Sequence, residues 1–146
     1  MTHSDDNIDF RNNPELYKIG RGEQGIFHVE PYKSELLPLW TIKTLATAKE
    51  ACENIYKNYL EYRSQSDFVG MDMARKFLQM GYTRARRYAN YKGGNKKKSE
   101  FGSGDPIKAE IAEIYREKWQ MVTKDTEYQK LKKLHQSRSK SSESEA

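Results

Sequence analysis

The stretch from residue 67 to residue 94 constrains the fold most, because its pattern is that of one long amphipathic helix. At about 100° per residue, the apolar side chains from Met71 to Ala89 fill one wide arc, and the polar side chains fall opposite. The apolar residues before and after Gly81 fall on the same side of the helix, which predicts one continuous helix. Glycine inside a helix costs about 1 kcal/mol relative to alanine, so we expect a neighbouring element to pack closely there.

Positive charge is concentrated in the second half of this helix and in the loop that follows it. Residues 1–74 contain 8 Lys/Arg and 12 Asp/Glu, a balance of −4. Residues 75–100 contain 9 and 1, a balance of +8, and residues 101–146 contain 9 and 8, a balance of +1. These sum to the net charge of +5. Clustering of this kind is typical of a protein that binds a polyanion.

The polar arc of the helix supplies the candidate phosphate contacts. Arg75 and Lys76 lie in register with the Arg86–Arg87 pair three turns later, and Arg84 is the one charge outside this arc. Cations in a last helical turn complement the helix dipole, but that does not explain cations three turns earlier. Tyrosines beside such an arc can stack on bases. The candidate nucleic-acid-binding residues are Arg75, Lys76, Arg86, Arg87, Lys92, Lys96, Lys97 and Lys98, with Tyr82 and Tyr91 as candidate base-stacking residues.

Three further helices are predicted around this one. A helix over about 45–64 has near-ideal three-four apolar spacing, with Thr47 and Glu50 available as a capping box. A helix over about 106–123 follows an N-cap aspartate and a proline at the first helical position. A short, strongly charged helix follows at about 126–135. With the central helix at about 67–92, the fold class is mainly α, with three core helices and a charged C-terminal helix.

A small N-terminal β-hairpin over residues 17–29 would make this an α+β variant of that class. Strand-like segments at 17–19 and 26–29 flank a glycine-rich stretch. The stretch fits a G-x-G-x-x-G phosphate-loop pattern, but a dinucleotide-binding fold requires a helix directly after the glycines. A hairpin turn is therefore the favoured interpretation. The alternative is a phosphate loop formed by Gly20, Arg21, Gly22 and Gly25.

The sequence divides into a folded centre and two polar ends. We expect a flexible lead-in over residues 1–13, a single compact domain over 14–135 and a disordered tail over 136–146, which is rich in Ser, Lys and Glu. No apolar run approaches the roughly 20 residues that span a bilayer, and the polar, acidic N-terminus is unlike a signal peptide. We therefore expect a cytoplasmic protein with no membrane partner.

Residues that could carry catalysis or bind metal are scattered. His3, His28 and His135 are far apart in sequence, and Cys52 has no CxxC or CxxH neighbour. Because Cys52 lies on the apolar stripe of the helix at 45–64, we expect a buried and unreactive thiol. These patterns predict no metal, no cofactor and no catalytic residue, and they favour a protein that is not an enzyme.

Three long motifs carry a resemblance to a known family. They are YKIGRGEQGIF, EPYKSELLPLW and FVGMDMARKFLQMGYTRARRYANYKGG, in that order. Over roughly residues 8–135 the chain resembles a family of small proteins, in bacteria and phages, catalogued only as a domain of unknown function. The resemblance implies an intracellular or virus-encoded single domain, and it implies no activity, cofactor or catalytic residue.

These features predict a small basic binding protein that contacts nucleic-acid phosphates through the helix and loop at 75–98. An acidic protein partner is the main alternative, and a phosphate- or nucleotide-handling role for Gly20–Gly25 is a lesser one. The sequence does not distinguish DNA from RNA or define an oligomeric state.

Overall fold

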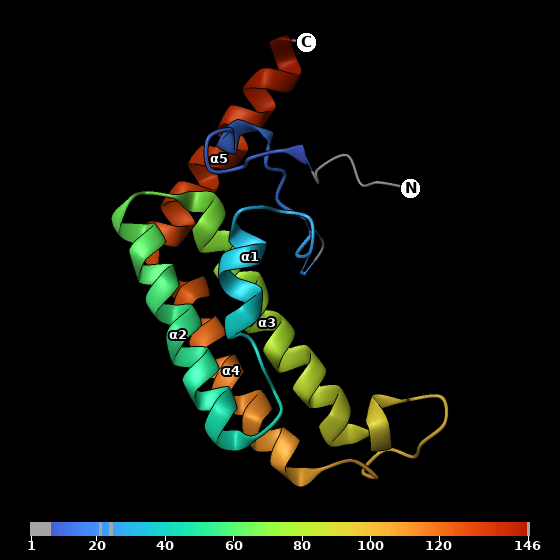
Figure 1. The fold of residues 1–146 in the computed structure, drawn as a ribbon. Helices are drawn as coiled ribbons and strands as arrows, with labels where there is room; N and C mark the ends of the chain where they lie inside the picture. The colour runs from blue at the N-terminus through green and yellow to red at the C-terminus, as the bar shows by residue number, and fades with distance from the viewer. Residues whose placement is uncertain (1–6, 21, 24, 146) are drawn as a thin grey trace.

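The computed structural model describes residues 7–20, 22, 23 and 25–145, with side chains as far as residue 138. This part of the chain is mainly helical, as predicted (Figure 1). The predicted helices at 45–64, 67–92 and 106–123 agree with the observed ones to within two residues at each end. The α-helices are α1 (Tyr32–Leu36), α2 (Leu45–Ser64), α3 (Phe68–Asn90), α4 (Pro106–Lys124) and α5 (Thr126–Glu145), joined by 3₁₀ turns η2 (Pro14–Leu16), η3 (Leu37–Leu39) and η4 (Lys92–Gly94).

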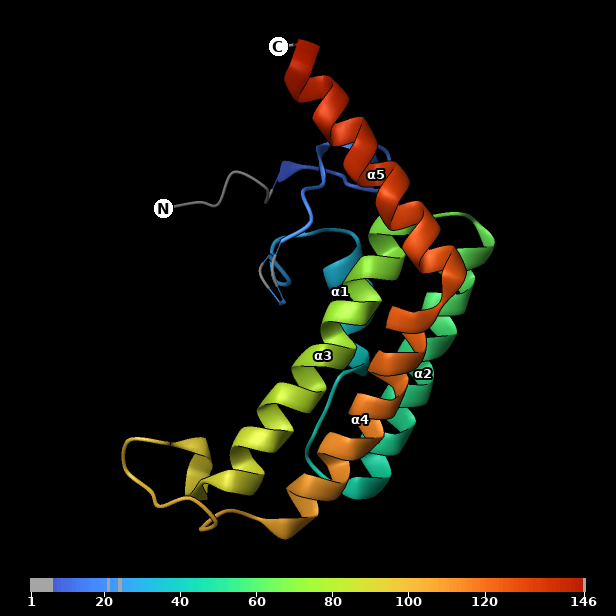
Figure 2. The same cartoon turned by 180° about the vertical axis from the view of Figure 1, so that it is seen from behind.

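The three long helices α2, α3 and α4 form the core bundle. α4 packs on one face of the α2–α3 pair, and the short helix α1 lies on the other face (Figures 1 and 2). α5 crosses the end of the bundle at which α3 begins, and the loop after α3 lies at the opposite end (Figures 1 and 2).

Polar side chains cap the three core helices at their N-termini. Asp67 accepts a hydrogen bond from the Gly70 amide, and Asp105 accepts one from the Ile107 amide, the second as predicted. α2 is capped by Thr44 and Thr47, each of which accepts a bond from the other's amide at 3.1 Å. The predicted capping box of Thr47 with Glu50 is therefore wrong by three residues.

Gly81 lies at a close contact between α3 and α4, and α3 continues through it without interruption. A Cβ atom at this position would lie 2.2 Å from the ring of Tyr115 on α4, a distance that real Cβ atoms do not show. The residue is glycine because the Tyr115 ring occupies the space of a side chain. The predictions of one continuous helix and of close packing at Gly81 are confirmed.

The predicted β-hairpin over residues 17–29 is wrong. The described residues of this segment form irregular structure and turns, with Gly22 at φ 54° and Gly25 at φ 81°, and no strand. Its apolar side chains do not alternate across a sheet. Instead, Tyr17, Ile26 and Val29 are each buried in the helical core.

The ends of the chain also differ from the prediction. Residues 1–6 of the predicted flexible lead-in lie outside the described residues, but Phe10 is only 1% exposed and packs at 6.1 Å from the ring of Tyr17. At the other end, α5 continues to Glu145 instead of ending near residue 135. The described part of the lead-in thus belongs to the folded domain.

Candidate nucleic-acid interface

The first half of α3 contains charges that are buried inside the protein. Asp72 has no exposed surface, Lys76 is 1% exposed and the Arg75 side chain is 11% exposed. Arg75 binds Asp72 through Nε at 2.8 Å, and its Nη1 donates to Gln79 at 2.8 Å. The prediction that Arg75 and Lys76 face solvent is therefore wrong.

The Asp72 carboxylate is the centre of a buried polar cluster, here called the Asp72 cluster. The hydroxyl groups of Tyr17 and Tyr128 both donate to it, the second at 2.6 Å. Burial alone would raise the pKa of Asp72, but the Arg75 guanidinium and these hydrogen bonds outweigh it and hold the pKa below its usual value. An ionised Asp72 balances the charge of Arg75, so both groups serve the fold.

Lys76 belongs to the same cluster. Its ammonium lies 5.3 Å from the centre of the Tyr17 ring, a cation–π distance. Burial lowers its pKa, the negative charge of Asp72 opposes that effect, and the charge of Arg75 adds to it. Lys76 is therefore not available to contact a phosphate, and the Arg75 guanidinium is already bound to Asp72 and Gln79.

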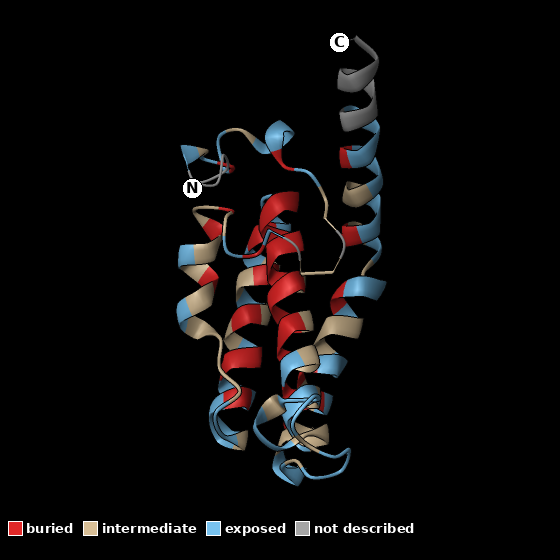
Figure 3. Ribbon diagram, turned by 90° about the vertical axis from the view of Figure 1, so that its right-hand side faces the viewer, coloured by how far each residue is buried: buried red, intermediate tan, exposed pale blue. Residues whose placement is uncertain are grey.

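The second half of α3 and the loop after it have exposed cations. The ribbon of this loop is coloured mainly as exposed in Figure 3. None of seven cations there forms an ion pair with another residue that the structure describes. Glu100 and Asp105 are the acids of this loop, and Asp105 caps α4. The basic end consists of Arg84, Arg86, Arg87, Lys92, Lys96, Lys97 and Lys98.

Hydrogen bonds fold the lysine-bearing loop into a defined turn. The Asn95 side chain accepts from the amides of Lys97 and Lys98 at 3.1 and 3.2 Å. Ser103 accepts from the Lys92 amide at 3.0 Å, and the Gly102 amide donates to the Asn90 carbonyl at 2.7 Å. The exposed lysine side chains therefore extend from an organised backbone.

A groove of about 350 Å³, here called the Trp40 groove, adjoins the basic end. The indole N–H of Trp40 donates to the Phe77 carbonyl at 3.0 Å, and the Tyr115 hydroxyl donates to the Thr41 carbonyl at 2.8 Å. These bonds attach one wall of the groove to α3 and α4. The lining residues are Trp40, Thr41, Ile42, Lys43, Arg84, Tyr88 and Lys108.

The groove combines aromatic rings with cations. The Arg84 guanidinium lies 5.8 Å from the ring centres of both Trp40 and Phe27. Tyr88 is 41% exposed, and its ring packs against the backbone at Gly94. Lys108 donates through Nζ to the carbonyl groups of residues 42 and 43. Sequence reasoning did not select these groove residues, although Arg84 stood apart on the helical wheel.

The two tyrosines predicted to stack on bases have other neighbours. The ring of Tyr82 stacks on Trp119 of α4 with ring centres 5.7 Å apart. Tyr91 makes an edge contact with Phe101 at 5.9 Å. Both are partly buried and neither lines the Trp40 groove, so Tyr88 is the better stacking candidate.

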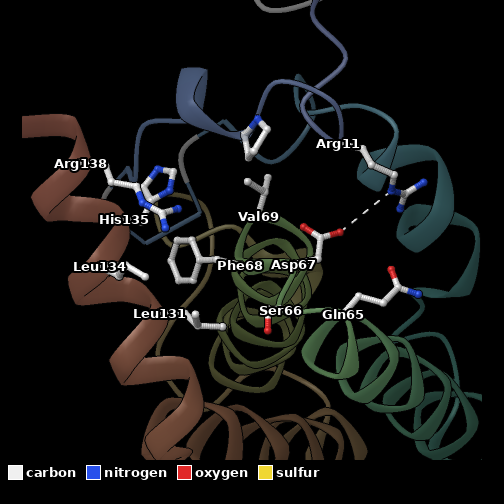
Figure 4. Close-up of a pocket in the computed structure, with 11 residues that line it drawn as sticks. Arg11, Gln65, Ser66, Asp67, Phe68, Val69, Leu131, Leu134, His135 and Arg138 are labelled. Carbon is white, nitrogen blue, oxygen red and sulfur yellow. Dashed lines mark ion pairs between the residues drawn. The ribbon is translucent and has the colours of Figure 1, made fainter. Parts of the chain in front are cut away.

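The opposite end of the bundle has a cavity of about 300 Å³ between the start of α3 and α5 (Figure 4). Its charges are largely paired: Arg11 binds Glu35 at 2.7 Å and lies 4.0 Å from Asp67. Phe68 packs beside His135 with ring centres 5.2 Å apart. Arg138 of α5 also lines this cavity.

The glycine-rich segment lines a third cavity, of about 380 Å³, together with Arg75 and Lys132. A phosphate loop presents backbone N–H groups to its ligand. Here the Gly22 carbonyl accepts from Arg75 Nη2 at 3.4 Å, and Gly20 also lies on the cavity wall. This arrangement favours a packed loop over a phosphate loop. Arg21, which belongs to the phosphate loop considered as an alternative, lies outside the described residues.

Cys52 is buried, as predicted. It is 1% exposed, its thiol donates to the Ile114 carbonyl at 3.6 Å, and burial raises its pKa to about 12. A thiol that stays protonated at neutral pH is a poor nucleophile. Within the described residues, no group of three or more His, Cys, Asp or Glu side chains is arranged to hold a metal ion.

Comparison with known proteins agrees with the resemblance of the three motifs. Residues 1–138 match the family described as a domain of unknown function, DUF4385. The chain belongs to this family. Neither a curated protein nor a solved structure matches it. Among the described residues of this family member, no helix combines the length and the apolar character needed to cross a membrane.

Proposed function

We propose that this protein binds nucleic acid by contacting its phosphates with the basic end. The observation that carries the proposal is that seven cations lie together there, with no ion pair to any residue that the structure describes. Unpaired surface cations attract a polyanion and release its condensed counterions on binding. Arg75 and Lys76 are left out of the site because they are buried.

Contacts of this kind give affinity and orientation without reading sequence. The basic end lies on a helix end and a short loop, and the acidic residues of the chain are concentrated elsewhere. The proposed setting is the cytoplasm of a bacterial or phage-infected cell, where nucleic acid is accessible. The protein acts there as a binding protein and not as an enzyme.

Salt dependence of binding tests the proposal. We expect the slope of log K against log salt on duplex DNA to be about −4, because about four to five phosphate contacts form. Replacing Lys96, Lys97 and Lys98 together by alanine should flatten the slope by about one unit for each phosphate that the protein no longer neutralises. The matched control replaces Lys57, Lys124 and Lys130, three exposed lysines on α2, α4 and α5, and should leave the slope unchanged.

An acidic protein partner is the other use of the same cations. It predicts no binding to duplex DNA, single-stranded DNA or RNA even at low salt, and a stoichiometric complex with one acidic protein. That result would overturn the nucleic-acid proposal. Equal loss of binding in the triple variant and its control would also contradict it, because it would show a response to net charge alone.

A further inference from the structure

The Trp40 groove has the chemistry that recognises a flat aromatic ligand. Tyr88 presents a ring that is 41% exposed, and its packing against Gly94 restricts where that ring can move. The Arg84 guanidinium is already positioned over two rings, those of Trp40 and Phe27. Rings and guanidinium planes are the surfaces on which unpaired bases stack in proteins that bind single strands.

The size of the groove suits one base with its sugar. Its volume of about 350 Å³ is near the lower limit of the usual range for small-molecule sites. Its walls are held by hydrogen bonds from Trp40, Tyr115 and Lys108 to backbone carbonyl groups. A ligand therefore meets a preformed surface, which reduces the ordering required on binding.

The groove is continuous with the basic end, because Arg84 belongs to both. Lys43 is exposed at its edge, next to the anchored Lys108. A phosphate backbone bound along the basic end would therefore pass beside the groove. In a duplex the bases are paired and stacked inside the helix, so their faces are not available to such a groove.

We propose that the Trp40 groove receives an unpaired base stacked on Tyr88, and that the preferred ligand is single-stranded DNA or RNA. This inference rests on the proposed function, since the basic end holds the backbone of the same strand. It adds a contact to the base itself, with no requirement for a particular sequence, because every base has a π face.

The decisive experiment compares two strands that differ only in their bases. Oligothymidylate and an abasic strand of the same length have the same phosphates, so binding through phosphates alone gives them equal affinity. We expect oligothymidylate to bind about ten-fold more tightly to the wild-type protein, as stacking of one base would give. Oligouridylate, tested in parallel, separates RNA from DNA through its 2′-hydroxyl groups.

Variants of Tyr88 localise the effect to the groove. Tyr88→Leu should reduce the ratio of the two affinities to about one, and Tyr88→Phe, which keeps the ring, should preserve it. Tyr91→Leu is the matched control at the same end of the bundle and should also preserve the ratio. Circular dichroism and thermal unfolding establish that each variant is folded.

The possible results separate the two proposals. Equal wild-type affinity for the oligothymidylate and abasic strands would overturn the base-stacking inference while leaving phosphate binding intact. A ratio that survives Tyr88→Leu in a folded protein would place the stacking elsewhere and overturn the assignment to this groove. Failure to bind either strand at low salt would overturn both proposals. If Tyr88→Leu does not fold, the wild-type ratio and the Tyr88→Phe and Tyr91→Leu variants still decide the inference.

Discussion

The two halves of α3 contain the same kinds of residue and use them in opposite ways. Arg75 and Arg86 are eleven residues apart, about three helical turns, so they lie on nearly the same side of the helix. Arg75 is largely buried and bound to Asp72, whereas Arg86 is partly exposed and has no ion pair among the described residues. What differs is the covering of each half by other parts of the chain.

The covering comes from segments that are distant in sequence. Tyr17, from the N-terminal segment, and Tyr128, from α5, close over the first half and donate to Asp72. Glu23 accepts a hydrogen bond from Thr83, which shows how far the N-terminal segment extends along α3. Beyond that point Arg86 is partly exposed and Arg87 is exposed. A charge therefore stabilises the fold or remains free for a ligand according to what packs over it.

The largest expected effect comes from removing the anion of the buried half. Asp72→Ala leaves Arg75 and Lys76 buried without this carboxylate, and the loss of one partner in such a group costs about 3–5 kcal/mol. Denaturant unfolding measures this change in the free energy of unfolding. Glu50→Ala, which removes an exposed acid on α2, is the control and should stay within about 0.5 kcal/mol. A loss below about 1 kcal/mol in Asp72→Ala would contradict the role of the cluster.

Acid should also weaken the Asp72 cluster. The folded-state pKa of Asp72 is lowered, so its stabilising contribution is complete above the unfolded value of about 4 and is lost as pH falls through the folded pKa. Glu35 and Asp125 have lowered pKa values as well and add to this acid sensitivity. The wild-type protein should therefore lose more stability than Asp72→Ala between neutral and acidic pH.

An intermediate effect is expected at Gly81, the close contact between α3 and α4. Gly81→Ala forces the Tyr115 ring to move, and overpacking of this kind costs about 1–3 kcal/mol. In a Tyr115→Leu background the same substitution should be less destabilising, because the ring is absent. A double-mutant cycle on the free energy of unfolding measures this coupling. If the effects of the two substitutions on the free energy of unfolding are strictly additive, the protein accommodates the alanine without moving the Tyr115 ring.

The smallest effect on stability is expected in the exposed half. Arg86→Ala combined with Arg87→Ala should change the free energy of unfolding by about 0.5 kcal/mol per site or less, because neither side chain forms an ion pair with a described residue. Thermal unfolding tests this directly. If the double variant unfolds, both halves of α3 are structural and the contrast between them disappears.

The sequence predicted those parts of the fold that depend on one helix at a time. Apolar spacing located α2, α3 and α4, and a local cap residue placed the start of α4 at Asp105. Glycine often interrupts a helix, but the unbroken apolar spacing correctly predicted that α3 continues through Gly81. The side chain of Cys52 was correctly placed in the core by the same reasoning.

Apart from the close packing at Gly81, features that depend on contacts between distant segments were not predicted. The apolar residues at 17–19 and 26–29 resemble strands locally, but no partner strand forms among the described residues, and the helices bury them instead. A helical wheel correctly groups Arg75 with Arg86 and gives no information about what covers them. The Trp40 groove joins residues 40–43 with Tyr88 and Lys108, which no periodicity connects.

The Asp72 cluster also has a consequence for the order in which a newly synthesised chain can complete its fold. Asp72 binds a tyrosine 55 residues before it and another 56 residues after it, and His135 contacts the Tyr17 carbonyl across 118 residues. A chain still attached to the ribosome before α5 has emerged can pair Asp72 with Arg75, but it lacks Tyr128 and His135. Docking of α5 must therefore follow its own synthesis, and the N-terminal segment receives its contact with His135 only after α5 has been made.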